Sequence, residues 1–222
     1  MIGQANIPLE AEGLHRFYRQ GEFEVAALRD VSLSCAAGET VAVTGPSGSG
    51  KSTLLGLLAG LDDPDGGVVR IGGRRLSHLG VAASAALRAS SIGVLTQASG
   101  LFGHLTVLEN VRFAASLRHT AGPEPAELIT ALGLSAVRDS RPATLSGGET
   151  ARAGLAVALA GAPLVLLADE PTAEVSSTEE QTVLELLHDW RPAHAATVIV
   201  THSPVVAASA DRVVQLVDGK VA

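Results

Sequence analysis

The chain has 222 residues, a formal net charge of −7, 46% hydrophobic residues and only 3% aromatic residues. This length can bury a full hydrophobic core, and the acidic balance argues against a nucleic acid or an anionic lipid surface as the main partner. Cys35 is the single cysteine, so an internal disulfide is excluded and a reducing cytosol is indicated.

The N-terminal part predicts a β-rich beginning. Residues 1–10 lack a basic region followed by an apolar stretch, which argues against a secretory signal. The stretch Leu14–Val43 has the pattern of short strands separated by turns, of which Ala36-Ala37-Gly38 is one. We therefore expect a small β subdomain ahead of the main core.

A glycine-rich phosphate loop, Gly45–Ser52, follows a strand predicted over Glu39–Thr44 and precedes a helix predicted over Ser52–Leu61. Glycines let such a loop curl so that several backbone N–H groups point inward, and the helix N-terminus adds partial positive charge. In this G-x-x-x-x-G-K-S pattern Lys51 reaches the β- and γ-phosphates, and the Ser52 hydroxyl can ligate Mg²⁺. The residues expected to hold a nucleoside triphosphate here are Gly45, Pro46, Ser47, Gly48, Ser49, Gly50, Lys51, Ser52 and Thr53.

The middle of the chain changes from strands to helices. Val68–Ile71 followed by two glycines predicts a hairpin, and Ile92–Leu95 predicts a buried strand. Thr106 and Glu109 match a capping box that opens a helix through about Arg118. A break at Gly122–Pro125 precedes a second helix, which ends near Leu132. Residues from about 98 to 145 therefore predict a helical insertion in an α/β core.

The segment Leu145–Glu149 leads into a helix that ends near Ala160. A serine and two glycines at a helix start can bind an anion, but they also suit an ordinary N-cap, and this motif alone favours the N-cap. The following apolar stretch, Ala153–Ala168, has 16 residues without a charge. That is short of the roughly 20 that a bilayer span needs, and Gly161 and Pro163 divide it into a helix and a strand.

Two carboxylates follow the predicted strand Leu164–Ala168. Parallel sheets place ligands at the C-terminal edge of their strands, where Asp169 would hold Mg²⁺ and Glu170 would polarise an attacking water. The alternative is a pair of solvated acids at a strand end. Beside a phosphate loop, the catalytic interpretation is the stronger one.

His202 and Gln97 are expected on the same rim, since each follows a predicted strand, Thr197–Thr201 and Ile92–Leu95 respectively. His202 could contact a γ-phosphate, and Gln97 could orient water or metal. A helix over Glu179–Trp190 and a final hairpin around Asp218-Gly219 complete the pattern. Alternating helices and strands of this kind predict an α/β fold with a parallel sheet flanked by helices.

Taken together these motifs resemble those of the ATP-binding-cassette ATPases, over nearly the whole chain. The motifs occur in the order phosphate loop, Gln97, Leu145–Glu149, Asp169-Glu170-Pro171-Thr172 and His202. The segments Gly21–Leu33, Leu105–Val111 and Leu167–Thr172 are most similar to the exporter branch for lipoproteins, macrolides or peptides, which includes the cell-division cassette. The resemblance implies one phosphate-loop NTPase domain over residues 1–222, with an N-terminal antiparallel β subdomain and the 98–145 helical subdomain.

The resemblance also implies site roles and partners. ATP and Mg²⁺ would be the cofactors, with Ser52, Gln97 and Asp169 on the metal and with Lys51, Gln97, Glu170 and His202 in hydrolysis. Two cassettes would sandwich two ATP molecules head to tail, with Ser146, Gly147 and Gly148 of one contacting the γ-phosphate bound to the other. Tyr18 would stack on adenine, unless it serves as a packing residue. Gln97 and the helical insertion would contact a membrane permease.

Several positions depart from the family pattern. Ser176 stands where an aspartate usually ends the loop after Thr172, and Ser203 follows His202 where an acidic residue is common. In the helix after Gly148 the departures are Thr150, Ala151 and Val157. We therefore expect hydrolysis to persist, either slowed or in combination with a different second cassette.

The leading hypothesis is an ATP-hydrolysing subunit that powers a membrane permease, in export of a lipoprotein, peptide, lipid or macrolide-like compound. The alternative is a cell-division-type cassette whose ATP cycle regulates a cell-wall hydrolase through a membrane partner. Either would be cytoplasmic, held at the inner face of the membrane by the permease, with no span of its own and no nucleic acid partner. A DNA-repair cassette would need a long coiled-coil insertion, and a translation cassette would need tandem cassettes.

Overall fold

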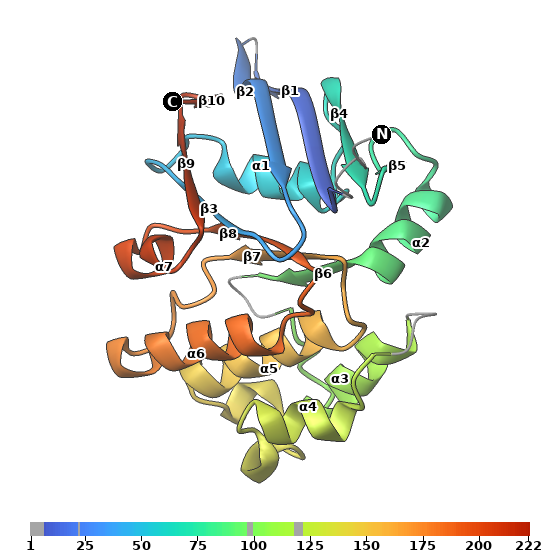
Figure 1. Ribbon diagram of the computed structural model, residues 1–222, viewed down its shortest axis with the longest axis vertical. Helices are drawn as coiled ribbons and strands as arrows, with labels where there is room; N and C mark the ends of the chain where they lie inside the picture. Colours follow the sequence, from blue (N-terminus) through green and yellow to red (C-terminus); the bar gives the residue numbers. More distant parts are fainter. Residues whose placement is uncertain (1–6, 22, 97–99, 118–121) are drawn as a thin grey trace, which may run out of the picture.

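The computed structural model describes residues 7–21, 23–96, 100–117 and 122–222, and in it two β-sheets and a layer of helices are stacked along the long axis. The antiparallel sheet lies at the top of Figure 1, the mainly parallel sheet crosses the middle, and most of the helices lie below it. This confirms the α/β class and the N-terminal antiparallel subdomain expected from the sequence.

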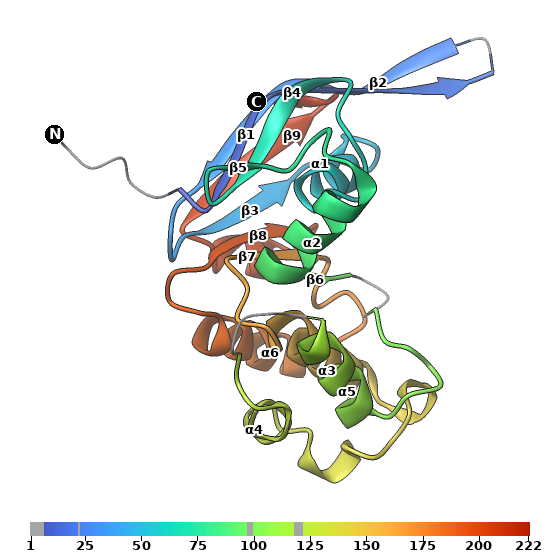
Figure 2. The same ribbon diagram turned by 90° about the vertical axis from the view of Figure 1, so that its right-hand side faces the viewer.

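The antiparallel sheet has the strand order β2-β1-β4-β5. Its strands are β1 (Leu9–Gln20), β2 (Phe23–Cys35), β4 (Gly66–Ile71) and β5 (Arg74–Arg75). The expectation of short strands over Leu14–Val43 was wrong, because β1 and β2 form one long hairpin whose tip projects from the body in Figure 2. Register shifts between Ala11 and Phe17 interrupt the alternation of buried and exposed residues, so the sequence suggested breaks where the strand continues. The β4–β5 hairpin was predicted.

The second sheet has the order β10-β9-β3-β8-β7-β6, in which β9, β3, β8, β7 and β6 are parallel and β10 is antiparallel to β9. Its strands are β3 (Thr40–Thr44), β6 (Ile92–Leu95), β7 (Val165–Asp169), β8 (Ala196–Val200), β9 (Arg212–Val217) and β10 (Lys220–Val221). Every residue of β8 is buried, as expected for a central parallel strand covered on both faces. The predicted strands therefore lie side by side with their carboxyl ends on one edge.

The described helical segments are α1 (Lys51–Leu58), α2 (Val81–Ser91), α3 (Val107–Ser116), α4 (Pro125–Ala131), η1 (Ser135–Val137), η2 (Pro142–Thr144), α5 (Gly147–Leu159), α6 (Ser177–Trp190) and α7 (Pro204–Ala208). The predicted capping box opens α3, and its expected end at Arg118 lies outside the described residues. The first helix ends earlier than expected, at Leu58 and not Leu61, since Gly60 adopts a left-handed conformation. Neither α2 nor α7 was predicted. α2 buries only Leu87, so it lacks an apolar stripe that the sequence could have revealed.

Two hydrophobic clusters hold the layers together. One fills the space between the two sheets around α1 and includes Leu14, Leu54 and Val198. The other lies on the opposite face of the parallel sheet and joins Ile199 of β8 to Val111 of α3 and to the Ala- and Leu-rich face of α5. The 98–145 segment thus shares its core with α5 and with the sheet. The expected boundaries of a helical subdomain, at about residues 98 and 145, stay a prediction.

The long uncharged stretch is divided as expected, into the end of α5 and strand β7. Of the helices in the described ranges, none combines the length and apolarity that a bilayer crossing requires.

Candidate active site

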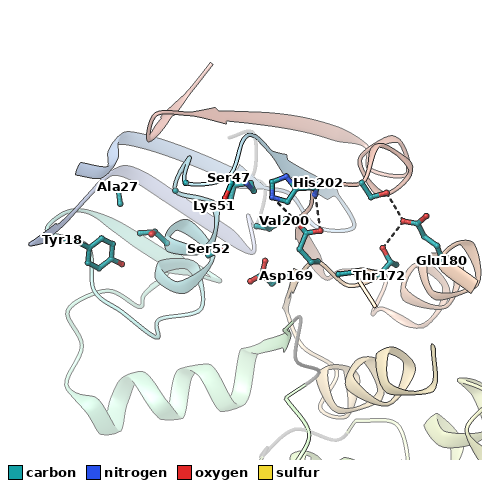
Figure 3. A pocket seen from close by; sticks show the side chains of 16 residues that line it. Tyr18, Ala27, Ser47, Lys51, Ser52, Asp169, Thr172, Glu180, Val200 and His202 are labelled. Carbon is teal, nitrogen blue, oxygen red and sulfur yellow. Dashed lines mark hydrogen bonds and ion pairs between the residues drawn. The ribbon is translucent and has the colours of Figure 1, made fainter. Parts of the chain in front are cut away.

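The site lies at the carboxyl ends of three neighbouring strands, with β8 between β3 and β7 in the sheet. The phosphate loop follows β3, Glu170 follows β7, and His202 follows β8. A cavity of about 650 Å³ opens at this edge, and Figure 3 shows the side chains pointing into it. Its lining residues are Tyr18, Ala27, Ser47, Gly48, Gly50, Lys51, Ser52, Thr53, Asp169, Glu170, Thr172, Ala173, Glu180, Val200, His202 and Ser203.

The shape of the phosphate loop depends on glycine at two places. Gly45 has φ +149° and Gly50, which precedes α1, has φ +102°. A Cβ at Gly45 would collide with the carbonyl oxygen of Leu216, and one at Gly50 would collide with the carbonyl oxygen of Ala27. Only glycine therefore suits both the dihedral angles and the close packing, which fixes the curl that turns N–H groups toward the cavity.

Lys51 is the cation of this loop and is 6% exposed. Its Nζ donates to the carbonyl oxygens of Gly45 at 2.8 Å and of Pro46 at 2.9 Å, which keeps the ammonium over the loop. Ser52 and Thr53 follow in the first turn of α1 and also line the cavity. Backbone donors, a buried ammonium and a helix N-terminus together make a site for a multiply charged phosphate chain.

Asp169 and Glu170 lie side by side at the end of β7. The pKa of Asp169 is raised by burial and by the negative charge of Glu170, while Lys51 opposes both. Asp169 and Ser52 line the same cavity as Lys51. A carboxylate and a hydroxyl are oxygen donors of the kind that Mg²⁺ prefers when it also binds phosphate, so these two residues fit that ion.

Glu170 is held from two sides. Its Oε2 accepts from Thr201 Oγ1 at 3.2 Å and from the backbone N–H of His202 at 3.2 Å, and its own N–H donates to Val200 O at 2.9 Å. Its Oε1 is buried without a hydrogen-bond donor in the described part of the chain and lies 3.7 Å from His202 Nε2. Glu170 has φ +46°, a conformation that costs energy in a residue with a side chain and persists where the surroundings enforce it. One oxygen is thus anchored and the other faces His202.

Tyr18 lines the far end of the cavity. Its hydroxyl donates to Asp62 Oδ2 at 3.3 Å, and the guanidinium of Arg16 lies 4.9 Å from the ring centroid. Arg16 is itself paired with Asp62 at 2.8 Å. Tyr18 is 39% exposed, so an aromatic surface is available there for stacking.

The residues Ser146, Gly147 and Gly148, here called the Ser146 motif, do not line this cavity. Ser146 caps α5 by accepting from Glu149 N at 3.2 Å, with the reciprocal contact from its own N–H to Glu149 Oε2 at 2.8 Å. A Cβ at Gly147 would collide with the carbonyl oxygen of Glu174, so the motif packs against the loop that follows β7. Ser146 is exposed, and none of the three motif residues is among those that line the cavity. Within one chain Ser146 is therefore exposed at the N-terminus of α5, whereas Gly148 is buried.

The structure thus brings together Lys51, Ser52, Thr53, Ser47, Gly48, Gly50, Asp169, Glu170, His202 and Tyr18, and Ser146, Gly147 and Gly148 are not among the residues that line the cavity. Gly45, Pro46 and Ser49 belong to the same loop but are not among the residues that line the cavity. Gln97 lies outside the described residues.

Sequence reasoning missed Glu180, Thr172 and Ser203 as members of the site. Glu180 Oε1 accepts from Thr172 Oγ1 at 3.0 Å and from Ser203 Oγ at 2.9 Å, and all three residues line the cavity. Glu180 stands in the acidic first turn of α6, where carboxylates are common for helix stability alone. No local signal could have separated it from Glu179.

Comparisons with known proteins identify a family and similar proteins for this chain. The sequence profile described as "ABC transporter" matches residues 28–173, more than half of the chain. The chain is 41% identical over 217 residues to the macrolide export ATP-binding/permease protein MacB of Salmonella choleraesuis (strain SC-B67), covering 96% of this chain and 34% of that protein. It is 40% identical over 217 residues to MacB 1 of Yersinia pestis bv. Antiqua (strain Antiqua), covering 96% and 33%. The chain therefore spans about one third of the length of these relatives.

Solved structures agree. The ATP-binding cassette MJ0796, in a dimeric post-hydrolysis state bound to ADP and Pi, superposes with a TM-score of 0.87 at 31% identity, covering 96% of each chain. A second dimeric structure of the same bacterial ABC transporter cassette gives a TM-score of 0.86 with the same identity and coverage.

Proposed function

This chain belongs to the ABC transporter family and is an ATP-binding cassette ATPase, and from that premise we propose that it couples ATP hydrolysis to the movement of a membrane permease. The single observation that carries the proposal is the cavity at the strand edge. Its lining includes Lys51, Ser52, Asp169, Glu170 and His202. In this proposal Lys51 binds phosphate, Ser52 and Asp169 bind the metal, and Glu170 and His202 act in hydrolysis.

Binding would rest on the phosphate loop. Lys51 and the inward N–H groups would neutralise the β- and γ-phosphates of ATP, and the exposed ring of Tyr18 would stack on adenine. Ser52 and Asp169 would hold Mg²⁺, with Gln97 as the third member of the metal set that we propose. Bound Mg²⁺ neutralises charge that develops on the phosphate oxygens.

Hydrolysis would rest on Glu170 and His202. Glu170 Oε2 is anchored by Thr201 and by the backbone of His202, so the carboxylate is fixed in orientation before a water arrives. It would accept a hydrogen bond, and then the proton, from the attacking water. His202 would contact the γ-phosphate with its exposed ring. Most of the rate enhancement in such a reaction comes from positioning and charge stabilisation.

The site is completed by a second copy or by a paired cassette in this proposal. Ser146 is exposed on its own chain, and the N-terminus of α5 that it caps suits an anion brought by a neighbour. Both MJ0796 structures are dimeric, which supports the same arrangement here. ATP would then lie between the Lys51 loop of one subunit and Ser146, Gly147 and Gly148 of the other.

We base the proposed partner and cargo on the names of the similar MacB proteins. Both MacB proteins are named as macrolide exporters that combine an ATP-binding and a permease part, which supports a permease partner and an export role for this chain. The cassette would then lie on the cytoplasmic face of the membrane. The cargo class that we propose is a macrolide-like, lipid, lipoprotein or peptide compound.

The experiment is an ATP turnover assay with the Glu170→Gln variant as the matched comparison. The wild-type chain should release phosphate in the presence of Mg²⁺ and stop when EDTA is added. Glu170→Gln should keep ATP affinity while losing turnover, because the amide cannot accept the proton. Full turnover in Glu170→Gln would show that the base is wrong.

The permease is best identified by capture from membranes with the ATP-loaded Glu170→Gln variant. Recovery of a membrane protein that moves macrolide-like compounds supports the proposal. Recovery of a membrane protein attached to a cell-wall hydrolase would replace it with the cell-division-type role.

A further inference from the structure

We propose that Glu180 is a positioning residue for hydrolysis, which ties together the two loops that carry Glu170 and His202. The inference rests on the proposed function of that site and adds a residue to it. Glu180 stands in the first turn of α6, and its carboxylate reaches the wall of the nucleotide cavity. It does not contact the reacting atoms in this arrangement.

The carboxylate joins two loops through a single oxygen. Glu180 Oε1 accepts from Thr172 Oγ1 at 3.0 Å and from Ser203 Oγ at 2.9 Å, and Figure 3 marks both contacts. Thr172 follows β7 and Ser203 follows β8. A charged acceptor makes stronger hydrogen bonds than a neutral one, so one side chain of α6 fixes the spacing of both loops.

From Ser203 a chain of hydrogen bonds leads to the proposed base. Ser203 N donates to Thr201 Oγ1 at 2.9 Å, and Thr201 Oγ1 donates to Glu170 Oε2 at 3.2 Å. The hydroxyl of Thr201 thus accepts from Ser203 and directs its proton at Glu170. A shift of Ser203 would therefore be transmitted to the oxygen that orients Glu170.

The loop after β7 links Glu180 to Glu170 more directly, through Thr172. Thr172 stands two positions after Glu170 and is 8% exposed. Glu170 itself has φ +46°, so its backbone needs support from its surroundings to remain in place. The Thr172–Glu180 contact supplies such support from within the loop that carries Glu170.

Burial strengthens the hydrogen bonds that link Glu180 to Glu170. Thr201 is 0% exposed and packs at the end of a fully buried strand, and Glu180 is half-buried. Hydrogen bonds in such surroundings are screened less by water than exposed ones. The acidic residue also stands in the first turn of α6, where the helix dipole favours a negative charge.

The test compares Glu180→Ala and Glu180→Gln in the ATPase assay. Glu180→Ala should lower kcat by about fivefold, the rate equivalent of one net hydrogen bond, with KM and ATP affinity within about twofold of wild type. Glu180→Gln should recover kcat to within about twofold, since the amide oxygen can still accept from both hydroxyls. A residue that matters only for folding would not give this division between kcat and KM at equal Tm.

Glu185→Ala is the matched control, because Glu185 is exposed on the same helix and bonds only Gln181 among its described contacts. It should leave kcat unchanged. A double-mutant cycle with Ser203→Ala should show that Glu180→Ala has a smaller effect once Ser203 cannot donate.

Unchanged kcat in Glu180→Ala, with an active wild type, would overturn the positioning role and leave the proposed function intact. Additive losses in the cycle would also overturn it. An inactive wild type in the presence of Mg²⁺ would instead count against the proposed function.

Discussion

His202 Nε2 lies 3.7 Å from Glu170 Oε1, although the two residues are 32 positions apart and follow different strands. The pairing of β7 with β8 brings them together, since Asp169 is the register partner of Val200. The second carboxylate oxygen is bound to Thr201 and to the backbone of His202. The sheet register therefore brings the proposed base and histidine together.

Replacing His202 with alanine should lower ATP turnover by about 10²-fold, the usual effect of losing one group that stabilises transition-state charge. ATP affinity should change little, because Lys51 and the loop supply most of the phosphate contacts. The ring is exposed, so Tm should stay close to that of wild type. Phosphate release measured at saturating ATP, beside calorimetry, checks both statements. Wild-type turnover in His202→Ala would remove the histidine from the site.

Gly45→Ala should destabilise the fold by about 1–3 kcal/mol and abolish ATP binding, because the added methyl group strains φ and meets the carbonyl oxygen of Leu216. Gly56 is the matched control, since it lies inside α1 and a Cβ there has open space around it. Gly56→Ala should raise stability by about 0.5–1 kcal/mol through helix propensity. Denaturant unfolding of both variants, with nucleotide titration, tests this. Equal effects would mean that loop shape does not depend on Gly45.

Ser146 and Thr106 cap α5 and α3 with the same capping-box geometry, each accepting from a glutamate N–H at 3.2 Å. Serine or threonine to alanine should therefore cost about 1 kcal/mol of stability at either site. Only Ser146→Ala should also lower turnover, since of these two capping residues only Ser146 is proposed to reach the partner's phosphate. Comparing kcat at matched Tm separates the two roles. A similar loss of kcat in Thr106→Ala would mean that capping explains both.

Cys35 should resist alkylation in the native protein. It is fully buried, its Sγ–H donates to Glu39 O at 3.3 Å, and burial followed by the charge of Glu39 raises its pKa to about 12. Because the folded-state pKa lies above that of the unfolded chain, stability should fall as the pH rises from the thiol's ordinary range toward 12. Iodoacetamide at pH 8.5 should label the protein only after denaturant is added. Rapid labelling of the native protein would contradict the burial.

Motifs with strong local signals were predictable. The phosphate loop is defined by its own glycines and Lys51, and β7 and β8 are short apolar runs that fit only a buried parallel strand. Because such strands end at one edge, Asp169, Glu170 and His202 could be placed together from the sequence alone. The capping box at Thr106 was likewise present in the residue pattern.

Features that depend on pairing between distant segments were not predictable. The length of the β1–β2 hairpin is disguised by register shifts, and α2 lacks an apolar stripe. Glu180 reaches Thr172 and Ser203 only because α6 packs beside the ends of β7 and β8. Nothing in its neighbourhood along the chain distinguishes it from an ordinary acid in a first helical turn.

The central claim is that a triphosphate lies between the Lys51 loop of one copy of this chain and the Ser146 motif of a second copy. The most direct measurement is the mass of the Glu170→Gln variant by light scattering, with and without Mg²⁺ and ATP. We expect a single chain of 22.5 kDa without nucleotide and twice that mass with ATP. Adding Ser146→Arg should keep ATP binding and prevent the doubling. A mass that never changes with ATP, or a doubling that survives Ser146→Arg, would contradict the claim.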